Sequence, residues 1–342
     1  MACSVVVRNV LQPDAVSAHA GVGLGVAEAA IAPSQIDNHV GLHSISRQDR
    51  DIAFGVAGDP IGSPVLVFYP AGGNRHMVCM MHELASSAAL KLICVNRPGK
   101  AGTTLPMEDG PMAHAVTACD DTVAVLDHLR IQKASLLFFC AGTPFALLFA
   151  ARYPERSTGR LMGSGSWVSP VDFEGAQLLY QIGGTLPTWF VARLVGSSFA
   201  SGPRMVRWLP ESALLRIVRG KLAHAERDAF DQHWPAPEQF ARAMQRQAEE
   251  AGGEAEDMQV LLSSFGDLGA HYNQIVSDIV FFHGEDDKIS PIDGVEWLAG
   301  QLPGATLRRL PLGTHDGLLL LLHSEVRDAL CGLASAAPVI AS

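Results

Sequence analysis

The feature of this sequence that most constrains its fold is a series of short apolar runs that alternate with helix-like segments. The runs are VLVFY (65–69), KLICVN (91–96), SLLFF (135–139) and DIVFFHG (278–284). Nearly continuous apolar runs are typical of strands in a parallel sheet, because both faces of such a sheet are covered. Strands that alternate with helices form right-handed βαβ units. The pattern therefore predicts an α/β fold with a mostly parallel central sheet flanked by helices, which include one over residues 76–89 and a closing one over residues 316–334.

The remaining patterns divide the chain into four parts. Residues 1–40 are rich in Ala, Val and Gly without a clear period, which predicts an N-terminal arm. Residues 41–170 and 266–342 carry the strand patterns and are expected to form one core. Residues 171–265, called the insertion below, contain amphipathic helical patterns and no convincing buried strand. A length of 342 residues allows about two domains. We therefore interpret the chain as one α/β core interrupted by a helical segment.

Composition and charge exclude several classes of protein. Hydrophobic residues make up 48% of the chain, enough for a large core, so a disordered chain is excluded. The net charge is −10, so the sequence gives no reason to expect a basic surface. Binding of nucleic acid needs such a surface, which argues against a nucleic-acid partner. The apolar stretch 134–151 is long enough to be a membrane-span candidate. Gly142, Thr143 and Pro144 at its middle favour a buried strand, a sharp turn and a buried helix instead, and no membrane span is expected.

Cysteine usage and ligand spacing give further expectations. The six cysteines are scattered without a CxxC pair, as is typical of reduced thiols in an intracellular protein, and we expect a cytoplasmic location. No His, Cys and Asp cluster has metal-ligand spacing, so no metal is expected. The glycine-containing loop AGGNR (71–75) lacks both the P-loop and the GxGxxG pattern, so no cofactor is expected either. The expected partner is a small-molecule substrate, and a homodimer remains an open alternative.

The segment that carries chemistry is FFCAGTP (138–144), which lies between an apolar strand and an apolar helix. A nucleophile on such a strand–turn–helix elbow is held at strained backbone angles, and small neighbours are needed for the tight turn. The helix N-terminus behind it supplies free N–H groups and a positive dipole end that stabilise a developing anion. Cys140 occupies the nucleophile position of this elbow.

The order of these landmarks resembles the α/β-hydrolase superfamily. The resemblance rests on RDIAFGVAGDPIGSPVLVFYP, CVNRPGKAGTT, FFCAGTPFALLFAARYPER and FFHGEDDKISP, and it covers about residues 42–335. It implies an α/β-hydrolase fold with the insertion at the position of the family's cap domain. The usual elbow of the family is G-x-S-x-G, so Cys140 stands where the family has its nucleophilic serine.

The resemblance also implies the partners of Cys140. It implies a histidine near the C-terminus, which is His315 in LGTHDGLL, and an acid on the loop after the late strand. In GEDDKISP the family spacing favours Asp287, with Asp286 and Glu285 as rivals. In such a triad the histidine takes the thiol proton and returns it to the leaving group, and the acid fixes the imidazole tautomer.

Two further groups of residues follow from the family pattern. The oxyanion hole would be formed by the backbone N–H groups of Ala71 and Ala141. The candidate substrate-pocket residues are Tyr69, Arg97, Phe139 and Trp167. For Arg97 and Trp167 a purely structural role is equally open, and His283 is expected to be a structural residue at a strand end.

The predicted function is that of an acyl hydrolase with a Cys140–His315–Asp287 triad. Its substrate would be an ester, thioester or lactone of a moderately large apolar metabolite. An alternative is a lyase, cyclase or condensation enzyme of specialised metabolism that uses the same pocket. That alternative is motivated by two aromatic residues before the nucleophile and by Tyr69-Pro70 in place of the family's His-Gly pair. A ligand-binding protein without enzymatic activity is a third alternative.

Overall fold

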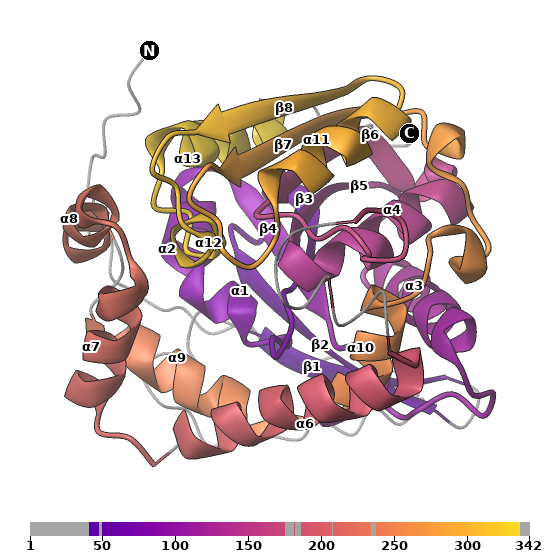
Figure 1. Cartoon of the computed structure of the whole chain (residues 1–342), viewed down its shortest axis with the longest axis horizontal. Coiled ribbons are helices and arrows are strands. Elements are labelled where there is room, and N and C mark those ends of the chain that lie inside the picture. Colours follow the sequence, from indigo (N-terminus) through magenta and orange to yellow (C-terminus); the bar gives the residue numbers. More distant parts are fainter. Residues whose placement is uncertain are drawn as a thin grey trace, which may run out of the picture.

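The computed structural model describes residues 41–47, 50–174, 181, 186–206, 208–233 and 237–335. The N-terminal arm predicted for residues 1–40 lies outside the described residues. Figure 1 shows the arrangement of the described elements, with a central sheet between layers of helices and the helices of the insertion along one side.

The core is an eight-stranded sheet with the strand order β1-β2-β4-β3-β5-β6-β7-β8. Strand β2 runs antiparallel to both of its neighbours, and all other neighbouring pairs are parallel. The predicted α/β class with a mostly parallel sheet is therefore confirmed. The strands are β1 (Gly41–Arg47), β2 (Arg50–Gly58), β3 (Ser63–Phe68), β4 (Leu90–Val95), β5 (Ala134–Phe139), β6 (Ser157–Ser164), β7 (Asp278–Gly284) and β8 (Ala305–Leu310).

The apolar runs of the sequence are the central strands, and alternate residues of each strand face different layers. In β5, Leu136 and Phe138 pack into one hydrophobic cluster, whereas Leu137 and Phe139 pack into another. The first cluster joins the sheet to α3 (Pro111–His128), α4 (Thr143–Arg152) and α11 (Ile292–Gln301). The second joins it to α1 (Met77–Met80), α2 (His82–Ser87) and α13 (Ser324–Gly332). Both faces of the sheet are thus buried, which explains why the strands lack alternation.

Two helices predicted as continuous are interrupted in the structure. The helix expected over residues 76–89 is the pair α1 and α2. The closing helix expected over residues 316–334 is the pair α12 (His315–Leu319) and α13. Leu321 between α12 and α13 has φ +53°, a left-handed conformation that a helix interior does not contain. A run of leucines has high helix propensity, so the break could not be read from the periodicity alone.

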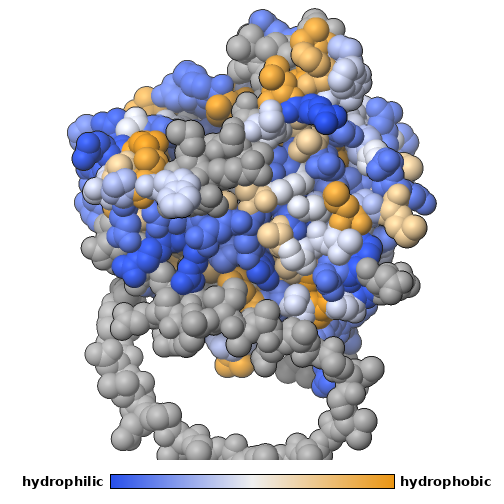
Figure 2. Space-filling model, turned by 90° about the horizontal axis from the view of Figure 1, so that it is seen from below, coloured by the Kyte–Doolittle hydropathy of each residue, from blue (hydrophilic) through white to orange (hydrophobic). Residues whose placement is uncertain are grey.

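The described part of the insertion is helical. Its helices are α6 (Thr188–Val206), α7 (Glu211–Lys221), α8 (His224–His233), α9 (Pro237–Glu249) and α10 (Glu254–Leu261). Figure 1 shows α6, α7, α8 and α9 on one side of the core, whereas α10 lies against the core near α3. On the face seen in Figure 2, the hydrophobic residues (orange) form small separate patches among hydrophilic residues (blue).

The apolar stretch 134–151 is strand β5, the short turn η1 (Cys140–Gly142) and most of helix α4, as predicted. Among the helices of the described residues, none combines the length and the apolar character that crossing a membrane requires.

Candidate active site

Cys140 lies at the turn between β5 and α4, with a backbone φ of +42°. Left-handed angles are uncommon for residues other than glycine, and they are characteristic of strained turns at functional sites. Thr143 supports the turn, because its hydroxyl donates to the Cys140 carbonyl over 2.8 Å and accepts the Trp167 N–H over 3.0 Å. Only a glycine fits at position 142, since a Cβ there would lie 2.2 Å from the Phe68 carbonyl oxygen. The sequence Cys-Ala-Gly thus folds into a nucleophile elbow.

The two aromatic residues before Cys140 do not crowd this elbow. Phe138 and Phe139 are fully buried, and they pack on opposite faces of the sheet. Gly163 on the neighbouring strand makes room for Phe138, because a Cβ at that position would approach the ring to 2.5 Å. Phe139, a predicted pocket residue, therefore lies in the core on the face of α1, α2 and α13.

The structure brings His315 and Asp287 together beside Cys140. His315 is the first residue of α12, and its Nδ1 lies 2.7 Å from Asp287 Oδ2 on the loop after β7. Cys140 is close enough to the same imidazole for its charge to act on the His315 pKa. Since Nδ1 faces the carboxylate, Nε2 is the nitrogen left for the thiol. Cys140 and His315 are each 7% exposed, so the three side chains meet in a nearly dry environment.

The loop after β7 selects one carboxylate among three neighbours. Asp287 Oδ1 accepts the N–H groups of Ile289 and Ser290 over 2.8 and 2.9 Å, which leaves Oδ2 for His315. Asp286 instead lies 3.8 Å from the exposed Lys288, and Glu285 is exposed. The backbone of this loop therefore orients Asp287, and neither rival, toward the imidazole.

The charges of the three groups support one another. Burial lowers the pKa of His315, but the charge of the Cys140 thiolate and the hydrogen bond to Asp287 outweigh it and raise this pKa to about 10. Burial raises the pKa of Asp287, yet the hydrogen bond and the charge of His315 lower it on balance. The arrangement favours an imidazolium between the Cys140 sulfur and the Asp287 carboxylate, and a positive charge beside the sulfur is a condition that activates a cysteine for nucleophilic attack.

A second layer of polar groups lies behind Asp287, and the structural role expected for His283 did not include its contact with this carboxylate. His283 is fully buried at the end of β7, and its Nε2 lies 3.0 Å from the Ser290 carbonyl oxygen and 3.4 Å from Asp287 Oδ2. The Ser290 hydroxyl donates to the Ser166 carbonyl over 2.6 Å. Burial lowers the pKa of His283, so this ring is neutral and donates from Nε2. The His-Gly pair that ends β7 was the available signal for this residue.

The predicted oxyanion-hole residues lie in the same apolar cluster as Cys140. Ala141 follows Cys140 in η1, and Ala71 on the loop after β3 packs against this cluster. The cluster also contains Trp167, Val191 and Ala192 of α6, Met258 and Leu261 of α10, and Leu262 directly after α10. Trp167 also donates from Nε1 to the Leu261 carbonyl over 3.0 Å. Helices of the insertion therefore pack apolar side chains around Cys140.

Arg97 and Tyr69 lie under the loop that carries Ala71. The Arg97 guanidinium donates to the carbonyl oxygens of Tyr69 and Pro70 over 3.0 and 3.3 Å, and it stacks on the Tyr69 ring. The Tyr69 hydroxyl accepts the Arg97 N–H over 2.5 Å. The same guanidinium is paired with Asp257 of α10 over 2.8 Å. Both predicted pocket residues thus have their polar groups bound within the protein.

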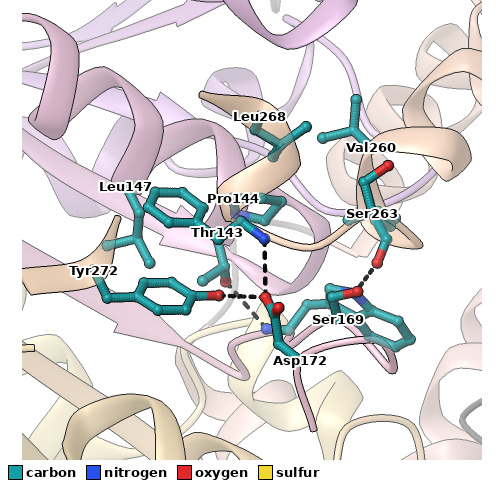
Figure 3. A pocket seen from close by; sticks show the side chains of 12 residues that line it. Thr143, Pro144, Leu147, Ser169, Asp172, Val260, Ser263, Leu268 and Tyr272 are labelled. Atoms are coloured by element: carbon teal, nitrogen blue, oxygen red, sulfur yellow. Dashed lines mark hydrogen bonds between the residues drawn. The ribbon is translucent and has the colours of Figure 1, made fainter. Parts of the chain in front are cut away.

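A small cavity of about 10 Å³ lies beside the elbow, on the α4 side (Figure 3). Thr143, Pro144 and Leu147 line it from α4, and Asp172 lines it from the start of the insertion. The Asp172 carboxylate accepts the Tyr272 hydroxyl and the Phe265 N–H over 2.9 and 3.0 Å. A volume of this size accommodates at most one water molecule. Cys140, His315 and Asp287 do not line the cavity, and it is too small to hold an acyl substrate.

In the described parts of the chain, no group of three or more His, Cys, Asp or Glu side chains could hold a metal ion.

The comparisons with known proteins concern the family and the fold of the chain. Residues 64–320 match the family model described as alpha/beta hydrolase fold. The uncharacterized hydrolase YcgS of Bacillus subtilis is 27% identical over 181 residues, which are 49% of this chain and 58% of that protein. The chain therefore spans little more than half the length of this curated relative.

Solved structures show the same fold. An alpha/beta hydrolase fold protein from Nakamurella multipartita matches with a TM-score of 0.60 at 19% identity, covering 86% of this chain and 99% of that one. An esterase from Exiguobacterium antarcticum matches with a TM-score of 0.59 at 16% identity, covering 85% and 98%. At these identities the likeness shows the shared fold.

Proposed function

Because the chain belongs to the α/β-hydrolase family, we propose that it is an acyl hydrolase whose nucleophile is Cys140. The observation that carries the proposal is the grouping of Cys140, on a strained elbow, with His315, whose imidazole is hydrogen-bonded to Asp287 and is influenced by the charge of Cys140. A thiolate, a general base and an orienting carboxylate are the parts that acyl transfer requires.

The reaction would proceed in two steps. The Cys140 thiolate attacks the acyl carbonyl carbon, and the N–H groups of Ala71 and Ala141 would stabilise the resulting oxyanion. When the intermediate collapses, the C–O or C–S bond to the leaving group breaks, and the His315 imidazolium gives its proton to that group. In the second step neutral His315 takes a proton from water, whose oxygen attacks the Cys140 thioester. The acid product leaves and the thiolate is regenerated.

The surroundings of Cys140 support an apolar acyl group as the substrate. The side chains from α6 and α10 that pack over the nucleophile carry no charge, and the Trp167 ring lies beside them. We therefore propose an ester, thioester or lactone with a moderately large apolar portion, bound under the insertion, which would act as a cap. The reduced thiol that this chemistry needs would suit a cytoplasmic location.

The test is hydrolysis of esters, thioesters and alkyl-substituted lactones by wild type and by C140A. We expect C140A to lower kcat/KM by more than about 10³-fold, because removal of a nucleophile abolishes the covalent route. Mass spectrometry of acid-quenched wild type should find the acyl group on Cys140. The matched control is C119A, which removes a buried thiol of α3 that is bonded to the Phe145 carbonyl. Unchanged turnover in C140A would refute the nucleophile role.

The same experiment separates the alternatives. A lyase, cyclase or condensation reaction in this pocket would form product without an adduct on Cys140. The Tyr69-Pro70 pair still favours that alternative, whereas the aromatic residues before Cys140 no longer do, because both lie in the core. A binding protein without activity would show ligand-induced stabilisation and no turnover.

A further inference from the structure

The insertion reaches the candidate active site at a second place, through Glu226 of α8. The residue is 2% exposed, although the helix belongs to a mostly polar segment. Its Oε1 accepts the Thr314 N–H over 2.8 Å, and its Oε2 accepts the Thr314 hydroxyl over 2.7 Å. Thr314 directly precedes His315, and its hydroxyl also accepts the Gly317 N–H over 3.1 Å as the N-cap of α12. One carboxylate of the insertion therefore binds the first turn of the helix that carries His315.

Other residues of the α12 region are shaped to receive this carboxylate. Gly317 leaves the space for it, because a Cβ at that position would lie 2.0 Å from Glu226 Oε1. His323, beyond the end of α12, donates from Nε2 to Glu226 Oε1 over 2.9 Å. The Ala223 N–H supplies a further bond to Oε2 over 2.9 Å. Burial raises the pKa of Glu226, but these bonds outweigh it and keep the carboxylate ionised.

The charged groups around the contact between Glu226 and the α12 region form two sets. Glu226 faces His323, and at the exposed rim of the same contact Lys221 lies 3.7 Å from Asp316. His315, on the other side of the α12 turn, faces Asp287 and Cys140. Glu226 does not touch the reacting groups. It is linked to His315 only indirectly, through its hydrogen bonds with the backbone and side chain of the preceding residue, Thr314.

We propose that Glu226 is a positioning residue that holds the first turn of α12, so that the His315 imidazole stays between Asp287 and Cys140. Helix α12 has five residues, and a helix of that length has little stability of its own. Two hydrogen bonds from Thr314 to an ionised carboxylate are strong enough to fix its start. The inference deepens the proposed function, since it rests on His315 being the base of the triad.

The test compares E226Q with wild type by the pH dependence of Cys140 alkylation with iodoacetamide, followed by mass spectrometry. The reagent forms an S–C bond to Cys140 and releases iodide, so the rate reports the thiolate without any substrate. We expect E226Q to react about tenfold more slowly at pH 6–7, where the thiolate depends on a well-placed imidazolium, and to match wild type at pH 10 and above. In hydrolysis of an ester substrate, kcat should fall while KM stays nearly unchanged.

A second variant and a matched control keep the outcome decisive. T314V removes the Thr314 hydroxyl, which is a partner of Glu226. It should shift the alkylation profile in the same direction as E226Q. It therefore tests the proposal even if E226Q fails to fold. The control is D121N, which removes a buried carboxylate that is paired with Arg50 over 2.8 Å, on the core helix α3. D121N should lower the melting temperature and leave the profile unchanged.

The proposal is overturned if E226Q or T314V melts at a lower temperature, as D121N does, but keeps the wild-type alkylation profile. Failure of the Glu226 proposal can be distinguished from failure of the hydrolase proposal. If wild type hydrolysed none of the acyl substrates, the proposed function would fall, while the alkylation profiles would still decide the role of Glu226.

Discussion

Cys140 holds a backbone conformation that most residues avoid, and the surrounding residues make it tolerable. The left-handed conformation costs roughly 1–2 kcal/mol for a residue with a side chain. At the elbow this cost is offset by the Thr143 hydroxyl on the Cys140 carbonyl and by close packing that requires glycine at position 142. This backbone conformation places the thiol at the start of α4, beside the His315 imidazole. Strain at a single residue is thus linked to the chemistry of the site.

At this scale we predict that C140A lowers the pKa of His315. The charge of the Cys140 thiolate is the largest contribution that raises this pKa to about 10, so its removal leaves burial opposed by Asp287 alone. An NMR titration of the imidazole should show the pKa moving down toward its ordinary value. C119A, which removes a distant thiol, should leave the titration unchanged. A His315 pKa that is identical in C140A and wild type would contradict a thiolate–imidazolium pair.

Helix α10 is the element that joins the insertion most tightly to the core. Its Asp257 is buried and contacts Arg97 over 2.8 Å, His114 Nε2 over 3.0 Å and Lys100 over 3.7 Å. Glu254 of the same helix accepts a bond from Lys100 over 2.7 Å. The chain before the helix packs backbone to backbone on the loop after β4, where a Cβ at Gly252 would lie 2.4 Å from the Gly99 carbonyl oxygen. Because Arg97 also binds the carbonyls of the loop before Ala71, α10 supports the proposed oxyanion hole.

We therefore expect D257N to lower the free energy of unfolding by about 3–5 kcal/mol, since it leaves buried cations without their charge partner. Denaturant unfolding measures this change. The control is D231N in the solvent-exposed pair of Asp231 and Arg219, which should have little effect. Equal losses in the two variants would show that the buried network does not hold α10 on the core.

On the scale of the whole molecule, the insertion is joined to the core by carboxylates that are buried or partly buried. Glu226 binds the α12 turn, Asp257 binds the loop after β4, and Glu250 binds Arg75 and His76 over 2.6 and 3.1 Å. In each case burial opposes ionisation, but the partners lower the pKa on balance. Such groups stabilise the folded state at pH values above their unfolded pKa, and this stabilisation is lost as they become protonated.

The sign of the pH effect can be worked out for Glu250. Its partners lower its pKa from 4.5 to about 2, so the unfolded chain binds more protons than the folded chain between these values. The stabilisation is complete above pH 4.5 and is lost as the pH falls toward 2. We predict that wild type loses stability more steeply than E250Q over this range, as measured by denaturant unfolding at successive pH values. Parallel slopes for the two proteins would contradict the prediction.

The sequence determined the features that depend on neighbours along the chain. Apolar runs specify the central strands, since a strand buried on both faces has no polar positions. Small residues after Cys140 specify the elbow, because only they fit the turn. The order of the landmarks was sufficient to identify the family, which the match over residues 64–320 confirms.

Tertiary structure decided what depends on contacts between distant segments. Asp287, Asp286 and Glu285 are neighbouring acids; the family spacing favoured Asp287, but the backbone N–H groups of the folded loop are what orient its carboxylate toward His315. Arg97 follows a strand like a pocket residue, yet Asp257, 160 residues away, binds its side chain. Glu226 lies 88 residues before Thr314 in a segment with an ordinary polar pattern. Local periodicity carries no information about such pairs, because their energy comes from desolvated charges that meet only when the chain is folded.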